Sequence, residues 1–494
     1  MRNPFLLLAF AAALAASACG SSGGGGGVGG TTALPGVGGA TSGGGSGGAA
    51  ATGGAPGSGG LGALGGGAGA VDAAAAGGSG GGGASGKGDA LGRGGVPASG
   101  GVLGSGGTRV ATGGSSGSGA GGNSRGTGGS PGAGGAGVDA GSGIDAGAAR
   151  GPWSMGYYAS WDQDQYPISE IEWSGLTHIA MAFYTPKASG ALSLMGGAAS
   201  LEKDLVSAAR QNGVKAVASI GGADSQADFK AATASGVIAT FVGNLVALMT
   251  TSGYDGIDID WEPLDKVDEP TVIDIATRVR KAKPDALVTI PIGEINVNLG
   301  ADLSNYAAIA AAYDQLNIMS YGQAGAWQGW KSWHSSALYH TDSATPTSID
   351  STIKLYLAAN VPAAKLGIGI GFYGLCYTSP VTGPDQALNG STVAASDGTM
   401  SYANIMTQYY DQSARKWDDL AKVPYLSFSS PHAPDSCTFI SYDDEESIAE
   451  KGAYVKAKGL GGVIQWELNE GYMPSSPAGK RNPLLKAIRD SVLH

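Results

Sequence analysis

Three acidic residues, Asp258, Asp260 and Glu262, alternate with isoleucine and tryptophan in the run 256–262. Successive side chains of a β-strand point to opposite faces, so this spacing places all three carboxyl groups on one face. Neighbours on that face lie roughly 6 to 7 Å apart, at about 3.3 Å of rise per residue. Repulsion and lost solvation then favour a protonated form of at least one of them near neutral pH. A carboxyl group kept protonated beside a substrate is a candidate general acid.

The acidic strand needs an enclosed space to face. Pro263 ends the run sharply, and the apolar face is β-branched and aromatic, as expected for packing on helices. A closed barrel of parallel strands then provides the space for the acids. A cation site fits poorly, because the strand context and Pro263 do not match a calcium loop. A solvated edge strand would bury only three apolar residues in mid-chain. The pattern therefore favours chemistry.

The run from Asp255 to Glu262 resembles the DxxDxDxE signature of glycoside hydrolase family 18, the chitinases and their relatives. Residues 219–222, Ser-Ile-Gly-Gly, are similar to the SxGG motif of the family, and residues 319–321, Met-Ser-Tyr, to its MxYD motif. The segments 156–161 and 177–183 look like its first two strands. The resemblance extends over about residues 153–492.

The resemblance implies roles for the acids. Carboxylates on one face of one strand cannot easily oppose each other across a bond, so the nucleophile must come from elsewhere. The family uses the 2-acetamido oxygen of the substrate. Glu262 would protonate the leaving oxygen and later activate water, while Asp260 and Tyr321 would hold the acetamido group. Asp258 would share a proton with Asp260. Asp255 lies an odd number of residues from the other three acids, so its side chain points to the opposite face of the strand. We interpret it as structural.

The resemblance also implies a set of substrate-binding residues. They are Tyr157, Phe183, Gly221, Gly222, Met319 and Trp466, the last in the eighth strand where the family places an aromatic under the reacting sugar. A flat indole suits the apolar face of a pyranose. One or two of the tryptophans in the loop after the sixth strand, Trp327 first among Trp327, Trp330 and Trp333, are expected to extend this platform.

One position departs from the family. Gly322 stands where the family has Asp after the tyrosine, which removes a carboxylate from the site. Glu294, just past the expected fifth strand, is a candidate partial replacement.

The expected activity is that of a chitinase acting on β-1,4 bonds between N-acetylglucosamine units. Two alternatives stay open: an endo-β-N-acetylglucosaminidase on glycoprotein glycans, and an inactive glycan-binding protein like the chitinase-like lectins. Such lectins typically lack the acid corresponding to Glu262, so its presence here favours an enzyme, whereas Gly322 keeps the binding alternative open.

The five histidines form no ligand pattern, so no metal or other cofactor is expected. We expect a monomer.

The elements that must position these residues alternate between strand and helix patterns. The expected strands cover residues 153–158, 178–184, 215–221, 256–262, 287–292, 315–321, 365–372 and 462–468. Helix-period runs lie between several of them, for example at 201–211, 238–250, 270–281 and 348–358. Eight strands separated by helices predict an α/β fold, a (β/α)8 TIM barrel, in a domain spanning residues 151–494.

An insertion of about residues 373–438 follows the seventh strand. It contains a predicted helix at 402–417 and both remaining cysteines, Cys376 and Cys437. In an exported protein two such cysteines suggest a disulfide, worth about 4 kcal/mol in the chain-entropy model. The position resembles the small domain that many family 18 chitinases insert after this strand, where it raises one wall of the substrate cleft.

The first 150 residues differ from the rest. Residues 1–19 read as a signal peptide, and residues 16–19 resemble a bacterial lipobox with Cys19 as the lipidated residue. This predicts a cell-surface or outer-membrane lipoprotein, with secretion as the alternative and the lipid as the sole membrane contact. Residues 20–150 are rich in Gly, Ala and Ser and lack aromatic residues, which predicts a disordered linker.

Charge excludes one class of partner. The chain carries a formal net charge of −11, and residues 1–150 hold 6 basic and 4 acidic residues, so the remainder carries about −13. This argues against nucleic acid as a partner and is compatible with a neutral glycan.

Overall fold

The computed structural model describes residues 151–494, except 199, 299 and 341–346. The predicted signal peptide, Cys19 and the predicted linker 20–150 lie outside the described residues. None of the helices in the described part combines the length and the apolar character that a membrane span requires.

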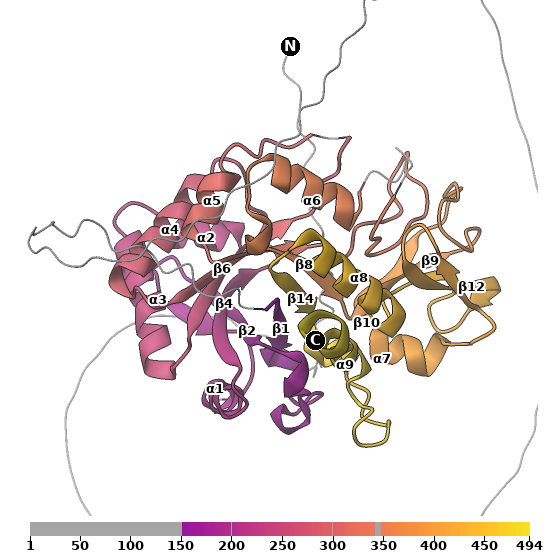
Figure 1. The fold of residues 1–494 in the computed structure, drawn as a ribbon, viewed down its shortest axis with the longest axis horizontal. Coiled ribbons are helices and arrows are strands. Elements are labelled where there is room, and N and C mark those ends of the chain that lie inside the picture. Colours follow the sequence, from indigo (N-terminus) through magenta and orange to yellow (C-terminus); the bar gives the residue numbers. More distant parts are fainter. Residues whose placement is uncertain (1–150, 199, 299, 341–346) are drawn as a thin grey trace, which may run out of the picture. The chain divides into compact units, whose positions relative to one another are not determined.

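Eight parallel strands form a closed barrel (Figure 1). They are β1 (Trp153–Ala159), β2 (His178–Pro186), β4 (Lys215–Gly222), β5 (Gly256–Trp261), β6 (Leu287–Gly293), β7 (Gln315–Met319), β8 (Leu366–Gly371) and β14 (Gly462–Trp466). β1 pairs in parallel with both β2 and β14, which closes the ring. The short strand β3 (Leu192–Leu194) pairs antiparallel with β2. The predicted TIM barrel is confirmed.

Helices lie outside the barrel strands (Figure 1). They are α1 (Leu201–Gln211), α2 (Gln226–Ala232), α3 (Ile238–Ser252), α4 (Glu269–Ala282), α5 (Tyr306–Ala312), α6 (Ile349–Ala358), α8 (Glu445–Lys458) and α9 (Pro483–Ile488). The four helices predicted from periodicity are all present. α1 shows the reason: its buried residues Leu201, Leu205 and Ala209 recur at four-residue spacing, so one stripe packs on the barrel.

Two local features fix the acidic strand in the barrel. A Cβ at Gly256 would lie 2.2 Å from the carbonyl oxygen of Leu287, so only glycine permits this approach of β5 to β6. The carboxylate of Asp255 accepts a hydrogen bond of 2.9 Å from the backbone N–H of Ala216. Asp255 therefore anchors the start of β5 on β4.

The insertion after β8 forms a second, antiparallel sheet in the order β10-β9-β13-β12-β11. Its strands are β9 (Tyr373–Thr378), β10 (Val393–Ser401), β11 (Arg415–Asp418), β12 (Val423–His432) and β13 (Cys437–Ser441). A disulfide joins Cys376 on β9 to Cys437 on β13, with 5.3 Å between their Cα atoms. It links two neighbouring strands of the sheet.

The helix predicted at 402–417 is wrong beyond its first turns. The structure has a short helix, α7 (Tyr402–Asn404), and a π-helical turn (Ile405–Tyr409). Asp411 then accepts hydrogen bonds of 2.8 Å from both the backbone N–H and the hydroxyl of Ser413, which forms a turn. The chain continues into β11, whose pairing with β12 supplies the backbone partners that a longer helix would have supplied.

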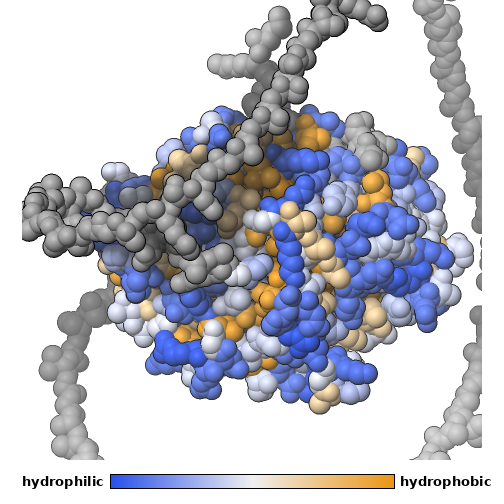
Figure 2. Space-filling model, in the orientation of Figure 1, coloured by the Kyte–Doolittle hydropathy of each residue, from blue (hydrophilic) through white to orange (hydrophobic). Residues whose placement is uncertain are grey.

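Apolar side chains on the surface are scattered. Figure 2 shows hydrophobic residues as separate patches among hydrophilic ones on the face that it draws. Most of the large apolar side chains are buried between the barrel and its helices or between the inserted sheet and the loop after β7. A third cluster fills the barrel itself and includes Tyr157, Phe183, Tyr321 and Trp466. Aromatic residues predicted to bind substrate therefore lie at the axis of the barrel.

Candidate active site

Asp258 is the innermost of the three acids. It is fully buried, and its carboxylate accepts hydrogen bonds from Tyr157 on β1 (2.9 Å), Ser219 on β4 (2.8 Å) and Thr289 on β6 (2.5 Å). Burial raises the pKa of Asp258, and the three hydrogen bonds oppose that rise. Partners on three other strands show that the acidic face of β5 points into the barrel.

Asp260 lies one step closer to the barrel mouth. It is 4% exposed, and its Oδ1 has no hydrogen-bond partner among the described residues. Burial, followed by the charges of Glu262 and Asp258, raises the pKa of Asp260 well above its usual range. The geometry therefore favours a protonated Asp260 at neutral pH.

Glu262 is the first residue beyond β5 and is half-buried. Burial, then the charges of Asp224 and Asp258, raises the pKa of Glu262 to about 7. The hydroxyl oxygen of Ser225 accepts the backbone N–H of Glu262 and the hydroxyl donates to the carbonyl of Asp260, each at 3.1 Å. Ser225 thus fixes the backbone at the end of the acidic strand. A carboxyl group with a pKa near 7 suits general acid and base work.

Asp224 is a residue that the sequence reasoning missed. It lies on the exposed loop after β4, two residues beyond the SxGG-like motif, with a left-handed backbone at φ +62°. Its charge raises the pKa of Glu262, so it lies near that carboxyl group. Its place directly after the motif was the signal available in the sequence.

The two glycines of that motif are required sterically. Gly221 and Gly222 have φ values of +111° and +93°. A Cβ on Gly221 would lie 2.1 Å from the backbone oxygen of Asp260, and one on Gly222 would lie 2.7 Å from the ring of Phe183. Both glycines therefore let β4 lie close to the backbone of Asp260 and to the ring of Phe183.

Aromatic rings form a floor beside the acids. Phe183 and Trp466 stack with ring centroids 5.5 Å apart and an interplanar angle of 17°. The ring of Tyr157 lies 5.6 Å from Trp466, and Trp161 stacks on Phe183 at 6.0 Å. Trp161 is 39% exposed, so this floor reaches the surface. Exposed and half-buried rings of this kind suit the apolar face of a sugar.

Tyr321 is the second residue beyond β7, which ends at Met319 and not at the predicted residue 321. Its ring packs edge-on against Tyr373 at 6.0 Å. Burial, followed by the charges of Tyr373, Asp260, Glu262 and Asp397, raises the pKa of Tyr321 well above its usual range. Its hydroxyl is therefore neutral and able to donate a hydrogen bond.

The glycine after Tyr321 leaves space that another side chain fills. Gly322 has φ +63°, and a Cβ there would lie 3.3 Å from the hydroxyl of Tyr373. That hydroxyl thus borders the place where the family aspartate would begin.

Glu294 is the first residue beyond β6, and burial together with the charge of Glu262 raises its pKa to about 7. Its predicted role as a replacement carboxylate stays a prediction.

The tryptophans after β7 separate into two groups. Trp327 packs edge-on against Trp330 with centroids 4.7 Å apart, and both are half-buried. Trp333 is buried in the apolar cluster that the loop shares with the inserted sheet. It belongs to the core and does not extend the aromatic floor, because the inserted sheet covers it.

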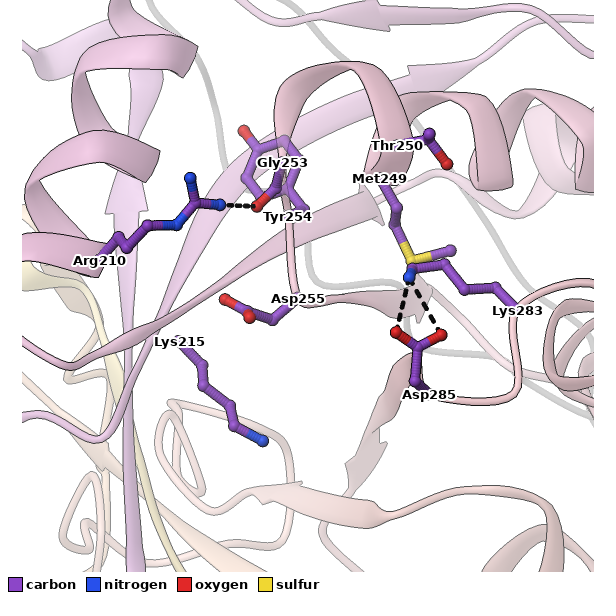
Figure 3. A pocket seen from close by; sticks show the side chains of 9 residues that line it. All are labelled: Arg210, Lys215, Met249, Thr250, Gly253, Tyr254, Asp255, Lys283 and Asp285. Carbon is purple, nitrogen blue, oxygen red and sulfur yellow. Dashed lines mark hydrogen bonds and ion pairs between the residues drawn. The ribbon is translucent and has the colours of Figure 1, made fainter.

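A separate cavity of about 370 Å³ opens at the opposite end of the acidic strand (Figure 3). It is lined by Arg210, Lys215, Met249, Thr250, Gly253, Tyr254, Asp255, Lys283 and Asp285. Lys215 begins β4 and Asp255 precedes β5, so this cavity lies at the strand starts, away from Glu262. No cluster of three or more potential metal ligands occurs within the described residues.

An acidic strand inside a closed (β/α)8 barrel, ending in a carboxyl group whose pKa is raised to about 7 beside stacked aromatic rings, is the arrangement expected of the TIM-barrel class of glycoside hydrolases. The family model described as "Glycosyl hydrolases family 18" matches residues 154–471, which is more than half of the chain. The protein belongs to that family.

Individual relatives carry chitinase names. A "chitinase-like effector" of Moniliophthora roreri is 27% identical over 366 residues, which cover 63% of this chain and 88% of that protein. "Chitinase A1" of Niallia circulans is 31% identical over 264 residues, covering 46% of this chain and 36% of that protein. The solved structure of the Group IV chitinase of Ostrinia furnacalis aligns with a TM-score of 0.60 and 20% identity, over 69% of this chain and all of that chain. That structural likeness shows the shared fold.

Proposed function

We propose that this protein is a chitinase that hydrolyses β-1,4 bonds between N-acetylglucosamine units, with Glu262 as acid and base. The observation that carries the proposal is the arrangement of the acids along β5. Asp258 is held inside the barrel by hydrogen bonds from three other strands, and Glu262, at the mouth end of the same face, has its pKa raised to about 7 by burial and nearby charges. The names of the relatives and the aromatic floor support a substrate made of sugars.

The nucleophile is inferred by elimination on β5. Asp258 is fully buried and held by three hydrogen bonds, so it is not free to attack. Burial and the charges of Glu262 and Asp258 raise the pKa of Asp260 well above its usual range, which makes it a poor nucleophile. Membership of family 18 implies that the carbonyl oxygen of the substrate's own 2-acetamido group attacks the anomeric carbon, with Asp260 and Tyr321 orienting that group.

Two steps then complete the reaction. In the first, the bond to the leaving oxygen breaks as that oxygen takes the proton of Glu262, and a cyclic oxazolinium ion forms. In the second, the Glu262 carboxylate removes a proton from water, and the resulting hydroxyl attacks the anomeric carbon and opens the ring. Two inversions give net retention of configuration, and Glu262 regains its proton.

The test is product analysis on chitin oligosaccharides, on a high-mannose glycopeptide and on cello-oligosaccharides, which lack the acetamido group. We expect cleavage of the chitin oligosaccharides alone, with retention of configuration. Glu262→Gln should reduce kcat by about 10²- to 10⁴-fold, because it removes the transferable proton, while substrate binding persists. Turnover by the Gln variant at a rate close to that of the wild type, or hydrolysis of cello-oligosaccharides as fast as that of chitin oligosaccharides, would exclude this mechanism.

One alternative has a specific observation in its favour. Gly322 removes a carboxylate from the site, and a relative is named a chitinase-like effector. A glycan-binding protein without hydrolysis is the outcome if the wild-type chain binds chitin oligosaccharides and releases no product. Cleavage of the glycopeptide alone would instead identify an endo-β-N-acetylglucosaminidase. Export, with a lipid on Cys19 or as a secreted protein, stays a prediction from the N-terminal sequence.

A further inference from the structure

An acid from the inserted sheet reaches the aromatic floor of the barrel. Oδ1 of Asp397 accepts a hydrogen bond of 3.2 Å from Nε1 of Trp466, although the two residues are 69 positions apart and belong to different sheets. The sequence reasoning did not single out Asp397. This contact joins the insertion to the ring on which a sugar is proposed to stack.

The backbone around Asp397 is shaped for this contact. Asp397 has a left-handed backbone at φ +48°, which a non-glycine residue seldom adopts. The pairing of β10 with β9 is interrupted between Ser396 and Ser401, so Asp397 lies in the irregular part of the strand. Interruptions of this kind re-aim a side chain out of the regular alternation. The irregular segment directs the carboxylate of Asp397 to the barrel.

Trp466 needs a partner to hold its plane. Its ring stacks on Phe183 and contacts Tyr157, which restrains it on one side. The indole N–H is the only polar group of the side chain, and Asp397 accepts it. A fixed ring plane matters because a sugar binds through its flat apolar face. The hydrogen bond sets the rotation of the ring, which stacking alone leaves free.

Two buried acids surround this contact. Glu467 and Glu470, directly after β14, are each 6% exposed, and each has one carboxyl oxygen without a hydrogen-bond partner among the described residues. Burial, followed by the charge of Asp397, raises the pKa of both well above the usual range. Burial raises the pKa of Asp397 as well, while the hydrogen bonds from the indole of Trp466 and from the backbone of Gly398 lower it. The indole bond therefore favours the charged form of Asp397, which is the form that makes the stronger hydrogen bond.

We propose that Asp397 is a positioning residue that orients the indole of Trp466 for sugar stacking. The inserted sheet then contributes directly to the substrate site through one side chain. The identity of the sugar rests on the proposed function, whereas the orientation of the ring does not.

The test is a double-mutant cycle of Asp397→Ala and Trp466→Phe, with Asp397→Asn as the conservative variant. We expect Asp397→Ala to raise KM for chitin oligosaccharides about ten-fold, the scale of one charge-assisted hydrogen bond, with a smaller change in kcat. Asp397→Asn keeps an acceptor and should stay within about three-fold of the wild type. In the Trp466→Phe background, Asp397→Ala should change KM by less than about two-fold, because the bond is already absent.

A fluorescence readout makes the test independent of the reaction. The emission of Trp466, taken as the difference between each protein and its Trp466→Phe counterpart, should change with Asp397→Ala and remain with Asp397→Asn. Asp419→Ala, at an exposed acid in the turn between β11 and β12, is the control and should leave KM and emission unchanged. Multiplicative effects of Asp397→Ala and Trp466→Phe, or an unchanged Trp466 emission, would overturn the proposal. If Asp397→Ala does not fold, the same double-mutant cycle is measured with Asp397→Leu. If the wild-type protein does not hydrolyse chitin oligosaccharides, the emission of Trp466 alone tests the orientation of its ring.

Discussion

At the scale of single residues, the acidity of Glu262 is set by its neighbours as much as by its strand. Burial is the first cause of its raised pKa, and the charge of Asp224 from the loop after β4 is the second. The strand pattern predicts the three acids on one face but says nothing of a fourth acid on another element. The working pH of the site therefore depends on a charge carried by another loop.

Asp224→Asn should lower the pKa of Glu262, because it removes a nearby negative charge that favours the protonated form. The first step of the proposed reaction requires protonated Glu262, so the alkaline limb of the kcat/KM profile should shift to lower pH. The shift should be a fraction of a pH unit and should shrink in high salt, because Asp224 is exposed. The measurement is a pH profile on chitin oligosaccharides.

Asp228→Asn is the matched control, since Asp228 is also exposed, on the adjacent helix α2, and is not among the charges that act on Glu262. An equal shift in both variants would point to net charge in place of a local contact. An unmoved limb for Asp224→Asn at low salt would contradict the assignment.

At the scale of elements, the buried Lys451 of helix α8 pairs with Asp443, just before that helix, and connects it by a hydrogen bond to the loop that follows β7. Nζ of Lys451 contacts both carboxylate oxygens of Asp443 at 2.6 and 2.7 Å and donates to the hydroxyl of Ser336 at 2.8 Å. The hydroxyl of Ser336 donates in turn to the carbonyl of Ser320, at 2.6 Å. Ser320 precedes Tyr321, so this chain of contacts supports the backbone that presents the tyrosine.

Lys451→Met should destabilise the barrel by about 3 to 5 kcal/mol, because it leaves the buried carboxylate of Asp443 without its countercharge. Adding Asp443→Asn should restore part of that loss, since the unpaired charge disappears. The free energy of unfolding in urea measures both effects. Lys456→Met, at an exposed position of the same helix, should cost less than about 0.5 kcal/mol. A loss at Lys451 no larger than this control would mean that the pair is not needed for stability.

At the scale of the whole molecule, several acids have pKa values above their usual range in the folded state. They are Asp258, Asp260, Glu262, Glu294, Asp397, Glu467 and Glu470. A group with a raised pKa binds its proton more tightly when folded, so it favours folding below its unfolded pKa and loses that effect as pH rises. Stability should therefore decline from about pH 4.5 through neutrality.

Replacing Glu467 and Glu470 by Gln should flatten this decline. Each acid contributes a loss of about 1.4 kcal/mol per pH unit between its unfolded pKa and its folded pKa, and glutamine has no proton to lose. The unfolding temperature measured from pH 4 to pH 8 should fall less steeply in the double variant than in the wild type. Asp204→Asn, at an exposed site on α1, should leave the slope unchanged. An identical slope in the double variant would show that neither acid is protonated in the folded state.

Predictions from the sequence agree with the structure where they depend on neighbouring residues and fail where distant segments interact. Residues 201–211 match the observed α1 at both ends, because a stripe of apolar residues is a local pattern. The helix predicted at 402–417 failed because the turn at Asp411 and the pairing of β11 with β12 compete with it. The sequence could not single out Trp333 as the buried member of its three tryptophans for a related reason, since the inserted sheet that covers it lies far along the chain.

The sequence by itself determined the barrel, the acidic face of β5, the glycines of the motif and the family, because each is a pattern of neighbouring residues with a fixed geometric meaning. The tertiary structure decided which acid is protonated, since burial and nearby charges set each pKa. It alone placed the charge of Asp224 where it acts on Glu262 and joined Asp397 to Trp466 by a hydrogen bond, and no local period relates these segments. The acidic residues of the site thus lie along one strand, and their pKa values depend on how distant segments pack around that strand.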